Sequence, residues 1–114
     1  MKIHANRVWA SAEGEYFQVL CEAVEDSTDP ESPYLVIQRQ FEDPDGGRCY
    51  VETHDSKFTG HFRVRRLDLS CVGLLLEIDR PGENVIEVTF AAPLADFDDV
   101  ARVAAIIAGS DGAP

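Results

Sequence analysis

The sequence has little positive charge for its size. It contains 10 basic residues against 21 acidic ones, which gives a formal net charge of -11. A surface this negative repels nucleic-acid phosphates and anionic lipid, because proteins bind both through clustered Lys and Arg. We therefore expect neither nucleic acid nor membrane as a partner. A basic protein is the partner that this charge favours, although acidity can also serve solubility alone.

Paired cysteines and long apolar runs are also absent. The cysteines Cys21, Cys49 and Cys71 are odd in number and widely spaced, which matches neither a disulfide framework nor a zinc knuckle. We expect all three to be reduced and buried. No apolar run reaches the length of a membrane span, and residues 1–10 lack the apolar core of a signal peptide. These absences predict a cytoplasmic protein.

What the sequence does contain is strand periodicity in a chain the size of one domain. The chain has 114 residues, and apolar residues alternate with polar ones in successive short segments. The expected strands span residues 2–12, 15–24, 34–41, 48–53, 62–69, 74–79 and 85–90. The alternation is imperfect in residues 2–12, and a bulge near Arg65 and Arg66 would return later apolar residues to one face.

After residue 90 the apolar spacing changes to three and four, which predicts a helix. Asp96 is the expected N-cap, and Gly109 is the expected end of the helix. The meander of residues 67–90 would form the floor beneath this helix. The predicted fold class is α+β: a mostly antiparallel β meander of about seven strands with one C-terminal helix packed on the sheet. A single domain would cover residues 1–109, followed by a disordered tail, 110–114.

Catalytic and metal-binding signatures are weak. The sequence has no nucleophile elbow, phosphate loop, dinucleotide fingerprint or HExxH motif. Cys49 with His54 or His61 is a poor candidate for a nucleophile dyad, because no third group supports it. The carboxylate-rich residues 22–31 lack the order of a calcium loop and favour a solvated loop. We expect no enzyme, cofactor or metal.

Aromatic side chains on the polar side of the strands are more informative. Tyr16, Tyr34 and Tyr50 fall on the outward positions of three strands, and Trp9 joins them. Rigid aromatic side chains ringed by carboxylates suit a protein interface, although tyrosines can also simply cover a two-sided sheet. Arg39 falls on the apolar side, where it would either snorkel or centre a buried polar network.

The order of these motifs resembles the Imm10-like immunity protein family of bacterial polymorphic toxin systems. The matching residues are Tyr34, Leu35, Val36, Ile37, Gln38, Arg39, Tyr50, Val51, Glu52, Gly60, the leucines at 67, 69, 74 and 76, Ile86 to Phe90, and the helix that opens at Phe97. The likeness covers residues 16–107. Most of these positions are core pattern, and Gln38, Arg39, Tyr50 and Glu52 are the distinctive ones.

This resemblance implies a cytoplasmic protein that neutralises a cognate toxin by occlusion and performs no chemistry. An acidic surface fits a basic toxin. The candidate toxin-binding residues are Tyr50, Glu52, Asp55, Tyr34 and Arg39. Two alternatives remain open: a regulatory module that forms a homodimer through a sheet edge, and a ligand-binding or enzymatic domain with a pocket between sheet and helix.

Overall fold

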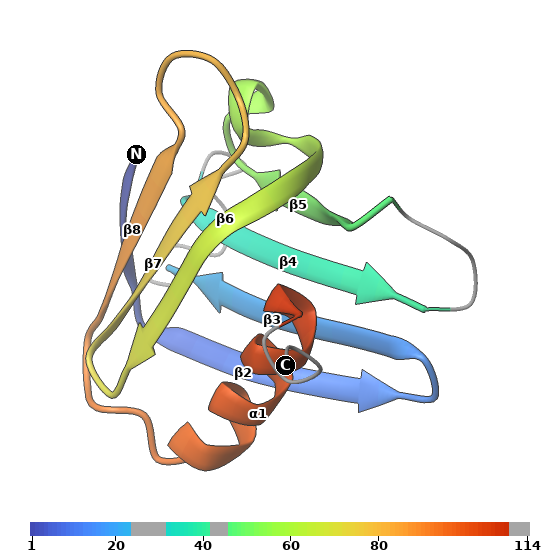
Figure 1. The fold of residues 1–114 in the computed structure, drawn as a ribbon. Helices are drawn as coiled ribbons and strands as arrows, with labels where there is room; N and C mark the ends of the chain where they lie inside the picture. The colour runs from blue at the N-terminus through green and yellow to red at the C-terminus, as the bar shows by residue number, and fades with distance from the viewer. Residues whose placement is uncertain (24–31, 42–45, 110–114) are drawn as a thin grey trace.

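Eight strands and one α-helix are present in the computed structural model, which describes residues 1–23, 32–41 and 46–109. In chain order the elements are β1 (Lys2–Ala5), β2 (Arg7–Glu13), β3 (Tyr16–Glu22), β4 (Tyr34–Gln40), β5 (Arg48–Thr53), the 3-10 turn η1 (Ser56–Phe58), β6 (Gly60–Ser70), β7 (Gly73–Ile78), β8 (Val85–Phe90) and α1 (Phe97–Ala108). The α+β prediction is confirmed, with one strand more than expected. Figure 1 shows the curved sheet with α1 packed against it.

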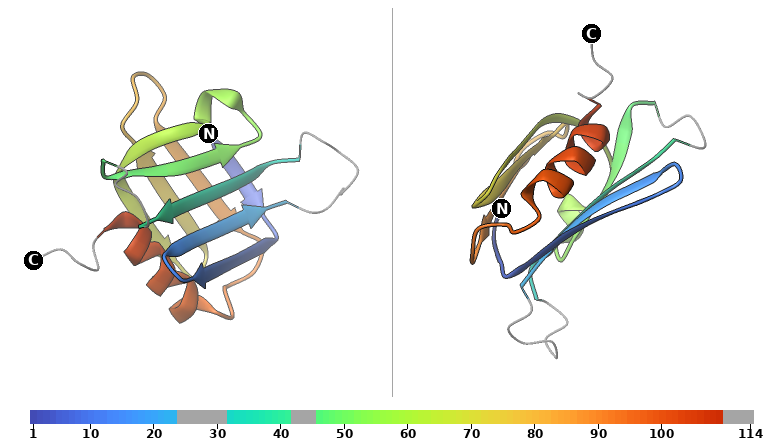
Figure 2. Two further views of the ribbon diagram at one scale, coloured as in Figure 1. Left: turned by 90° about the vertical axis from the view of Figure 1, so that its right-hand side faces the viewer. Right: turned by 90° about the horizontal axis from the view of Figure 1, so that it is seen from below.

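The sheet curls so far that its two edge strands are neighbours in the chain. The strand order is β1-β8-β7-β6-β5-β4-β3-β2. All neighbouring strands are antiparallel except β1 and β8, which are parallel, with Ile3 opposite Val88. Asn6 alone separates β1 from β2, and its N–H donates to the carbonyl of Glu22 over 3.1 Å. The views in Figure 2 show the two walls that this curvature creates.

The first predicted strand, residues 2–12, is wrong as a single element. The extended segment is interrupted at Asn6. The residues before Asn6 form β1, which pairs with β8 and not with β3. The second part, β2, does form the expected hairpin with β3. The irregularity expected near Arg65 is also confirmed, because the register of β6 against β7 shifts between Val64 and Arg66.

The predicted helix is confirmed at both ends. α1 begins at Phe97, and Gly109 follows its last residue with a left-handed φ of 79°, a conformation that glycine adopts without a steric penalty. Asp96 occupies the N-cap position, but its side chain forms no capping hydrogen bond; its carbonyl accepts from the N–H of Val100 over 3.0 Å. The helix therefore depends on burial of its apolar stripe more than on its cap.

Helix α1 lies between two walls of the sheet (Figure 2). It packs on β2, β3 and β4 on one side and on β6 on the other. The prediction that residues 67–90 form the floor under the helix is therefore only partly right. That meander contributes β6, whereas most of the remaining contact comes from the first half of the chain.

Inward side chains from both walls and from α1 form one core. Its fully buried members include Val19, Leu35, Ile37, Val51, Phe58, Leu76, Ile78, Ile86, Val100, Val103 and Ile107. Cys21 and Cys49 are buried as predicted, and burial raises the pKa of the Cys21 thiol to about 12. The prediction is wrong for Cys71, which is exposed because it occupies the turn between β6 and β7.

Two predictions fall wholly or partly outside the described residues: the solvated loop at 22–31 and the tail at 110–114. Within the described ranges, no helix has the length and hydropathy that a membrane crossing requires.

Candidate functional site

The outward-facing side of β2 to β6 carries the residues that the sequence singles out. Strand alternation buries Leu35 and Ile37 and turns their neighbours on β4 outward. Strand register then aligns the outward residues in rows: Val36 lies opposite Leu20 and Glu52, and Gln38 lies opposite Gln18 and Tyr50. We call this surface the outer face. It consists of Trp9, Gln18, Leu20, Tyr34, Val36, Gln38, Tyr50, Glu52 and His61.

Two tyrosines bind one carboxylate at the centre of the outer face. The hydroxyl of Tyr34 donates to Oε2 of Glu52 over 2.8 Å, and the hydroxyl of Tyr50 donates to Oε1 over 2.7 Å. All three side chains are partly buried. Because Tyr34 is on β4 and the other two residues are on β5, the contacts also join two strands. We call these three residues the tyrosine–glutamate cluster.

The hydrogen bonds in the cluster change the acidity of all three groups. Bonds from Tyr50 and Tyr34 hold the pKa of Glu52 below its ordinary value, since they stabilise the carboxylate. Burial, followed by the bond to Glu52, raises the pKa of Tyr34 to about 12. The bond to Glu52 is the main cause that raises the pKa of Tyr50. At neutral pH the cluster therefore holds one negative charge and two neutral phenols.

A histidine lies beside each tyrosine. The rings of Tyr50 and His61 have centroids 5.3 Å apart, and those of Tyr34 and His54 are 6.4 Å apart. Nδ1 of His54 also accepts a long hydrogen bond of 3.4 Å from the backbone N–H of Tyr34. These contacts restrict the two tyrosine rings and fix the directions in which their hydroxyls point.

An apolar row leads away from the cluster towards the edge of the sheet. Trp9, Leu20 and Val36 are cross-strand neighbours on β2, β3 and β4, and the row ends at Glu52. Trp9 is 39% exposed, which is high for a residue of its size. The outer face thus combines a fixed polar centre with an accessible aromatic and aliphatic border.

Two of the five predicted site residues lie apart from the cluster. Arg39 is on the opposite side of β4: its Nη1 donates to the carbonyl of Ile107 over 3.1 Å, and its guanidinium lies 4.9 Å from the centre of the Phe41 ring. It therefore anchors the end of α1. Asp55 follows β5 and caps η1 by accepting from the N–H of Lys57 over 3.0 Å.

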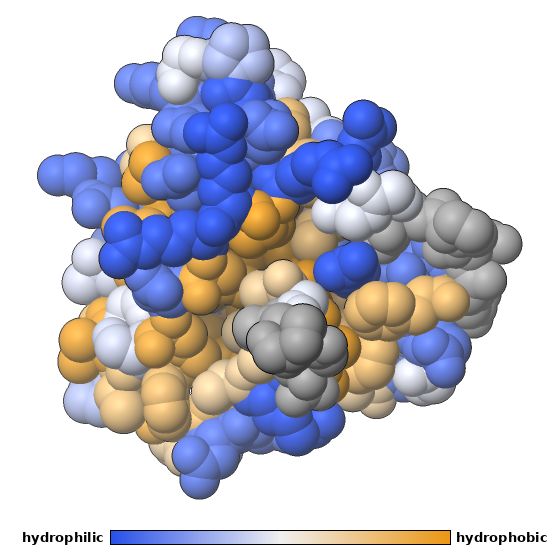
Figure 3. All heavy atoms as spheres, in the orientation of Figure 1, coloured by the Kyte–Doolittle hydropathy of each residue, from blue (hydrophilic) through white to orange (hydrophobic). Residues whose placement is uncertain are grey.

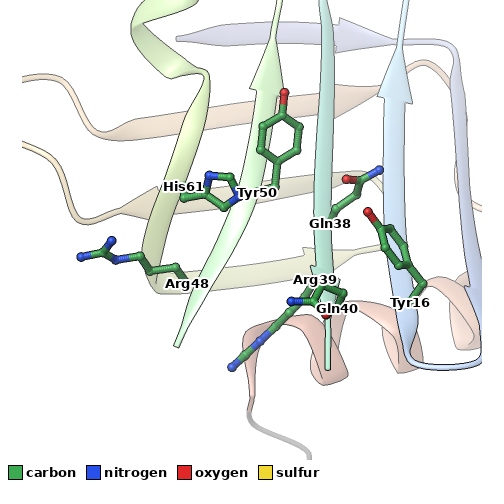
Figure 4. Close-up of a pocket in the computed structure, with 7 residues that line it drawn as sticks. All are labelled: Tyr16, Gln38, Arg39, Gln40, Arg48, Tyr50 and His61. Atoms are coloured by element: carbon green, nitrogen blue, oxygen red, sulfur yellow. The ribbon is translucent and has the colours of Figure 1, made fainter. Parts of the chain in front are cut away.

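A shallow depression of about 300 Å³ adjoins the cluster. Its lining residues, drawn in Figure 4, are Tyr16, Gln38, Arg39, Gln40, Arg48, Tyr50 and His61. Every one of these side chains is neutral or cationic. Nε2 of Gln38 donates to Oε1 of Gln18 over 2.5 Å, which ties the middle of this surface to β3.

The arginines of β6 differ in their partners. Arg65 pairs with Asp79 over 3.0 Å and Arg66 with Asp68 over 2.5 Å, as expected for exposed pairs, which contribute roughly 0–1 kcal/mol each. In Figure 3 hydrophilic residues gather in the upper part of the view, where Figure 1 places the start of β6. Arg63 instead lies opposite Arg48 of β5.

The geometry does not support a nucleophile dyad of Cys49 with His54 or His61. Cys49 is buried, and its Sγ donates to the carbonyl of Ile107 over 3.5 Å. His61 is on the outer face and His54 is also exposed, so the sheet separates both imidazoles from the thiol. Within the described ranges, no group of three or more His, Cys, Asp or Glu side chains is arranged to hold a metal ion.

Comparison with known proteins finds no match that bears on this site. No family model, curated protein or solved structure matches this chain. The resemblance to Imm10-like immunity proteins accordingly stays a prediction from the quoted residues.

The sequence interpretation missed several members of the outer face. Leu20 and Val36 were recognisable as outward positions from strand alternation, yet as aliphatic residues they carried no functional signal. His61 became significant only through its register with Tyr50. Pairing across strands, which single-strand periodicity does not reveal, brings these residues together.

Proposed function

We propose that this protein is an immunity protein that binds a cognate bacterial toxin in the cytoplasm and neutralises it by occlusion, without chemistry of its own. The observation that carries the proposal is the tyrosine–glutamate cluster, in which Glu52 accepts from Tyr34 and Tyr50. Tyrosine is enriched at interface hot spots. The family resemblance supports the same conclusion, since Tyr34, Tyr50 and Glu52 are among its matching residues.

The cluster suits recognition because its side chains are ordered before a partner arrives. Immobilising a side chain on binding costs about 0.5–1.5 kcal/mol, and here hydrogen bonds and ring contacts already restrict both tyrosines. The apolar row of Trp9, Leu20 and Val36 supplies adjacent surface that a partner can exclude from water. This arrangement resembles an interface core with a polar anchor.

Charge favours a basic toxin. The net charge of -11 attracts a positively charged partner and accelerates its encounter with the protein. Glu52 would present its carboxylate where a basic toxin, such as a nuclease, binds substrate phosphates. Occupation of that surface would then block the substrate.

The decisive experiment is co-expression with the product of the neighbouring gene. The wild-type chain should bind that product and restore growth, whereas the double variant Tyr34→Ala, Tyr50→Ala should protect poorly. Leu75→Ala is the matched control, because Leu75 is a half-buried outward residue on β7, outside the outer face. Absence of binding and protection by the wild type would overturn the proposal.

One feature favours a second candidate, a module that dimerises through a sheet edge. β2 is an edge strand of seven residues and is largely exposed. Antiparallel pairing of two copies about Ala10 would place Arg7 of one copy opposite Glu13 of the other, so the charges would be complementary. A stable dimer in sedimentation at micromolar concentration, abolished by Ala10→Pro, would support this candidate; a monomer would reject it.

A further inference from the structure

Two arginines face one another across β5 and β6. The protein has eight arginines. Within the described ranges, Arg7, Arg65, Arg66 and Arg102 pair with carboxylates, and Arg39 and Arg80 donate to the backbone carbonyls of Ile107 and Glu83. The remaining two, Arg48 and Arg63, are cross-strand partners.

This pairing is costly unless something negative lies nearby. Like charges directly opposite one another destabilise a sheet, and no described carboxylate pairs with either side chain. Arg63 does not turn away from its neighbour: its Nη1 lies 3.4 Å from the place where a Cβ on Gly47, the residue before Arg48, would be. In a chain with 21 acidic residues, this excess of positive charge among the described side chains needs an explanation.

The surroundings of the pair are suited to a small ligand. The depression beside it is lined by Tyr16, Gln38, Gln40, Tyr50 and His61, together with Arg48. In Figure 4 the aromatic rings and the amide groups lie on the same face, with Arg48 extending across β6 below His61. The volume of about 300 Å³ is at the lower limit for small-molecule sites, which are roughly 300–1,000 Å³.

We propose that Arg48 and Arg63 bind the carboxylate of a small organic anion, whose planar body lies in the adjoining depression. A guanidinium group matches a carboxylate through two parallel N–H donors, and a second guanidinium group adds further donors and attraction for the same carboxylate. The faces of Tyr50 and His61 receive the planar body, and the amides of Gln38 and Gln40 contact its polar edge. The site shares Tyr50 and His61 with the outer face, but its test needs only the isolated chain and no toxin.

The test uses acetate and benzoate as probes, since they share a carboxylate and differ only in the planar body. Titration of the isolated protein at low ionic strength, followed by NMR of the amide and arginine Nε–H signals, should give saturable shifts at Arg48, Tyr50 and His61. We expect benzoate to bind with a dissociation constant on the order of 1 mM and acetate several-fold more weakly. Equal affinities would overturn the assignment of the body to the depression.

Matched variants locate the carboxylate. Arg48→Gln combined with Arg63→Gln should weaken benzoate binding by about tenfold or more, because hydrogen bonds between charged groups are stronger than those between neutral ones. Arg65→Gln is the control, since Arg65 is on the same strand but pairs with Asp79. Binding that persists in the double variant, or no saturable shift in the wild type, would overturn the proposal.

Stability in the absence of a ligand provides a second readout. If the arginine pair is held for binding, Arg63→Gln should raise the melting temperature of the free protein by removing the repulsion. Benzoate should raise the melting temperature of the wild type and leave that of the double variant unchanged. A lower melting temperature for Arg63→Gln without ligand would mean that the arginines stabilise the fold, and would contradict the proposal.

Discussion

The outer side of β4 and β5 and the outer side of β7 and β8 follow the same alternation but are organised differently. On the first, Glu52 accepts hydrogen bonds from Tyr34 and Tyr50. On the second, Glu77 lies between Val85 and Arg66, and Glu87 lies between Leu75 and Lys2, yet neither carboxylate bonds to another described side chain. Periodicity decides which residues face outward, whereas hydroxyl donors nearby on the same face, two positions along the strand for Tyr50 and diagonally across it for Tyr34, fix the carboxylate of Glu52.

This difference matters for recognition because fixed groups lose little entropy when a partner binds. Solvated carboxylates such as Glu77 and Glu87 contribute to the field of the whole protein but not to a defined shape. The two surfaces therefore serve as an internal comparison: substitutions on β4 and β5 should affect binding and stability, and equivalent substitutions on β7 and β8 should not.

The largest effect should be on toxin affinity. Tyr50→Ala removes an ordered aromatic side chain from the centre of the outer face, and hot-spot truncations of this kind cost at least about 2 kcal/mol, or roughly 30-fold in affinity. Leu75→Ala should change affinity by less than about twofold. Isothermal titration calorimetry with the cognate toxin measures both. Equal losses in the two variants would erase the distinction between the two surfaces.

A smaller effect should appear in the stability of the free protein. Glu52→Gln replaces two charge-assisted hydrogen bonds with weaker neutral ones, so the free energy of unfolding should fall by about 1–2 kcal/mol. Glu87→Gln should change it by less than about 0.5 kcal/mol, because Glu87 is exposed. Urea denaturation of the two variants measures the difference. A loss at Glu87 as large as that at Glu52 would show that the cluster adds nothing to stability.

The sequence predicts the local features of the fold because they depend on neighbouring residues. Alternation on β7 and β8 identifies Leu76, Ile78 and Ile86 as core residues, and all three are fully buried. The spacing after residue 90 likewise gives the bounds of α1. These features follow from a period of two or of 3.6 residues, which a single strand or helix displays by itself.

Features that join distant parts of the chain were not predictable in this way. The parallel pairing of β1 with β8 brings Ile3 to Val88, and no local pattern encodes a contact over that separation. Arg39 was recognised as an inward residue, but its acceptor, the carbonyl of Ile107, is on α1. The sequence indicated only part of the tyrosine–glutamate cluster. Strand alternation places Tyr50 and Glu52 on the same face of β5, while Tyr34 joins them through the register of β4 against β5.

Association kinetics should show a still smaller change. Asp55→Lys should slow association with a basic toxin by a few-fold at low salt, since rim charges act mainly on the association rate. Asp55 also caps η1, so Asp55→Ser is the control that keeps a capping side chain and removes the charge. Stopped-flow measurement at two salt concentrations separates these contributions. Unchanged rates for Asp55→Lys and Asp55→Ser alike would remove Asp55 from the interface.

The dependence of the free energy of unfolding on pH should show the contribution of Glu52 at acid pH. Because its pKa is lowered in the folded protein by the bonds from Tyr50 and Tyr34, its contribution is complete above the ordinary glutamate pKa of about 4.3 and is lost as pH falls through the lowered value. The stability difference between the wild type and Glu52→Gln should therefore shrink in that range. A difference that stays constant down to the acid transition would contradict the assigned shift.

At alkaline pH the free energy of unfolding should show the contribution of Tyr34. This contribution is lost as pH rises, whereas that of Glu52 is lost as pH falls. Burial and the bond to Glu52 raise its pKa to about 12, so the folded state favours the protonated phenol. Its contribution is complete below the ordinary tyrosine pKa of about 10 and is lost as pH rises from there through 12. Urea unfolding of the wild type and of Tyr34→Phe should therefore give curves that converge between these two values. If the curves remain parallel, the hydroxyl of Tyr34 does not bind Glu52 in solution, and the ordered centre that distinguishes β4 and β5 from β7 and β8 is lost.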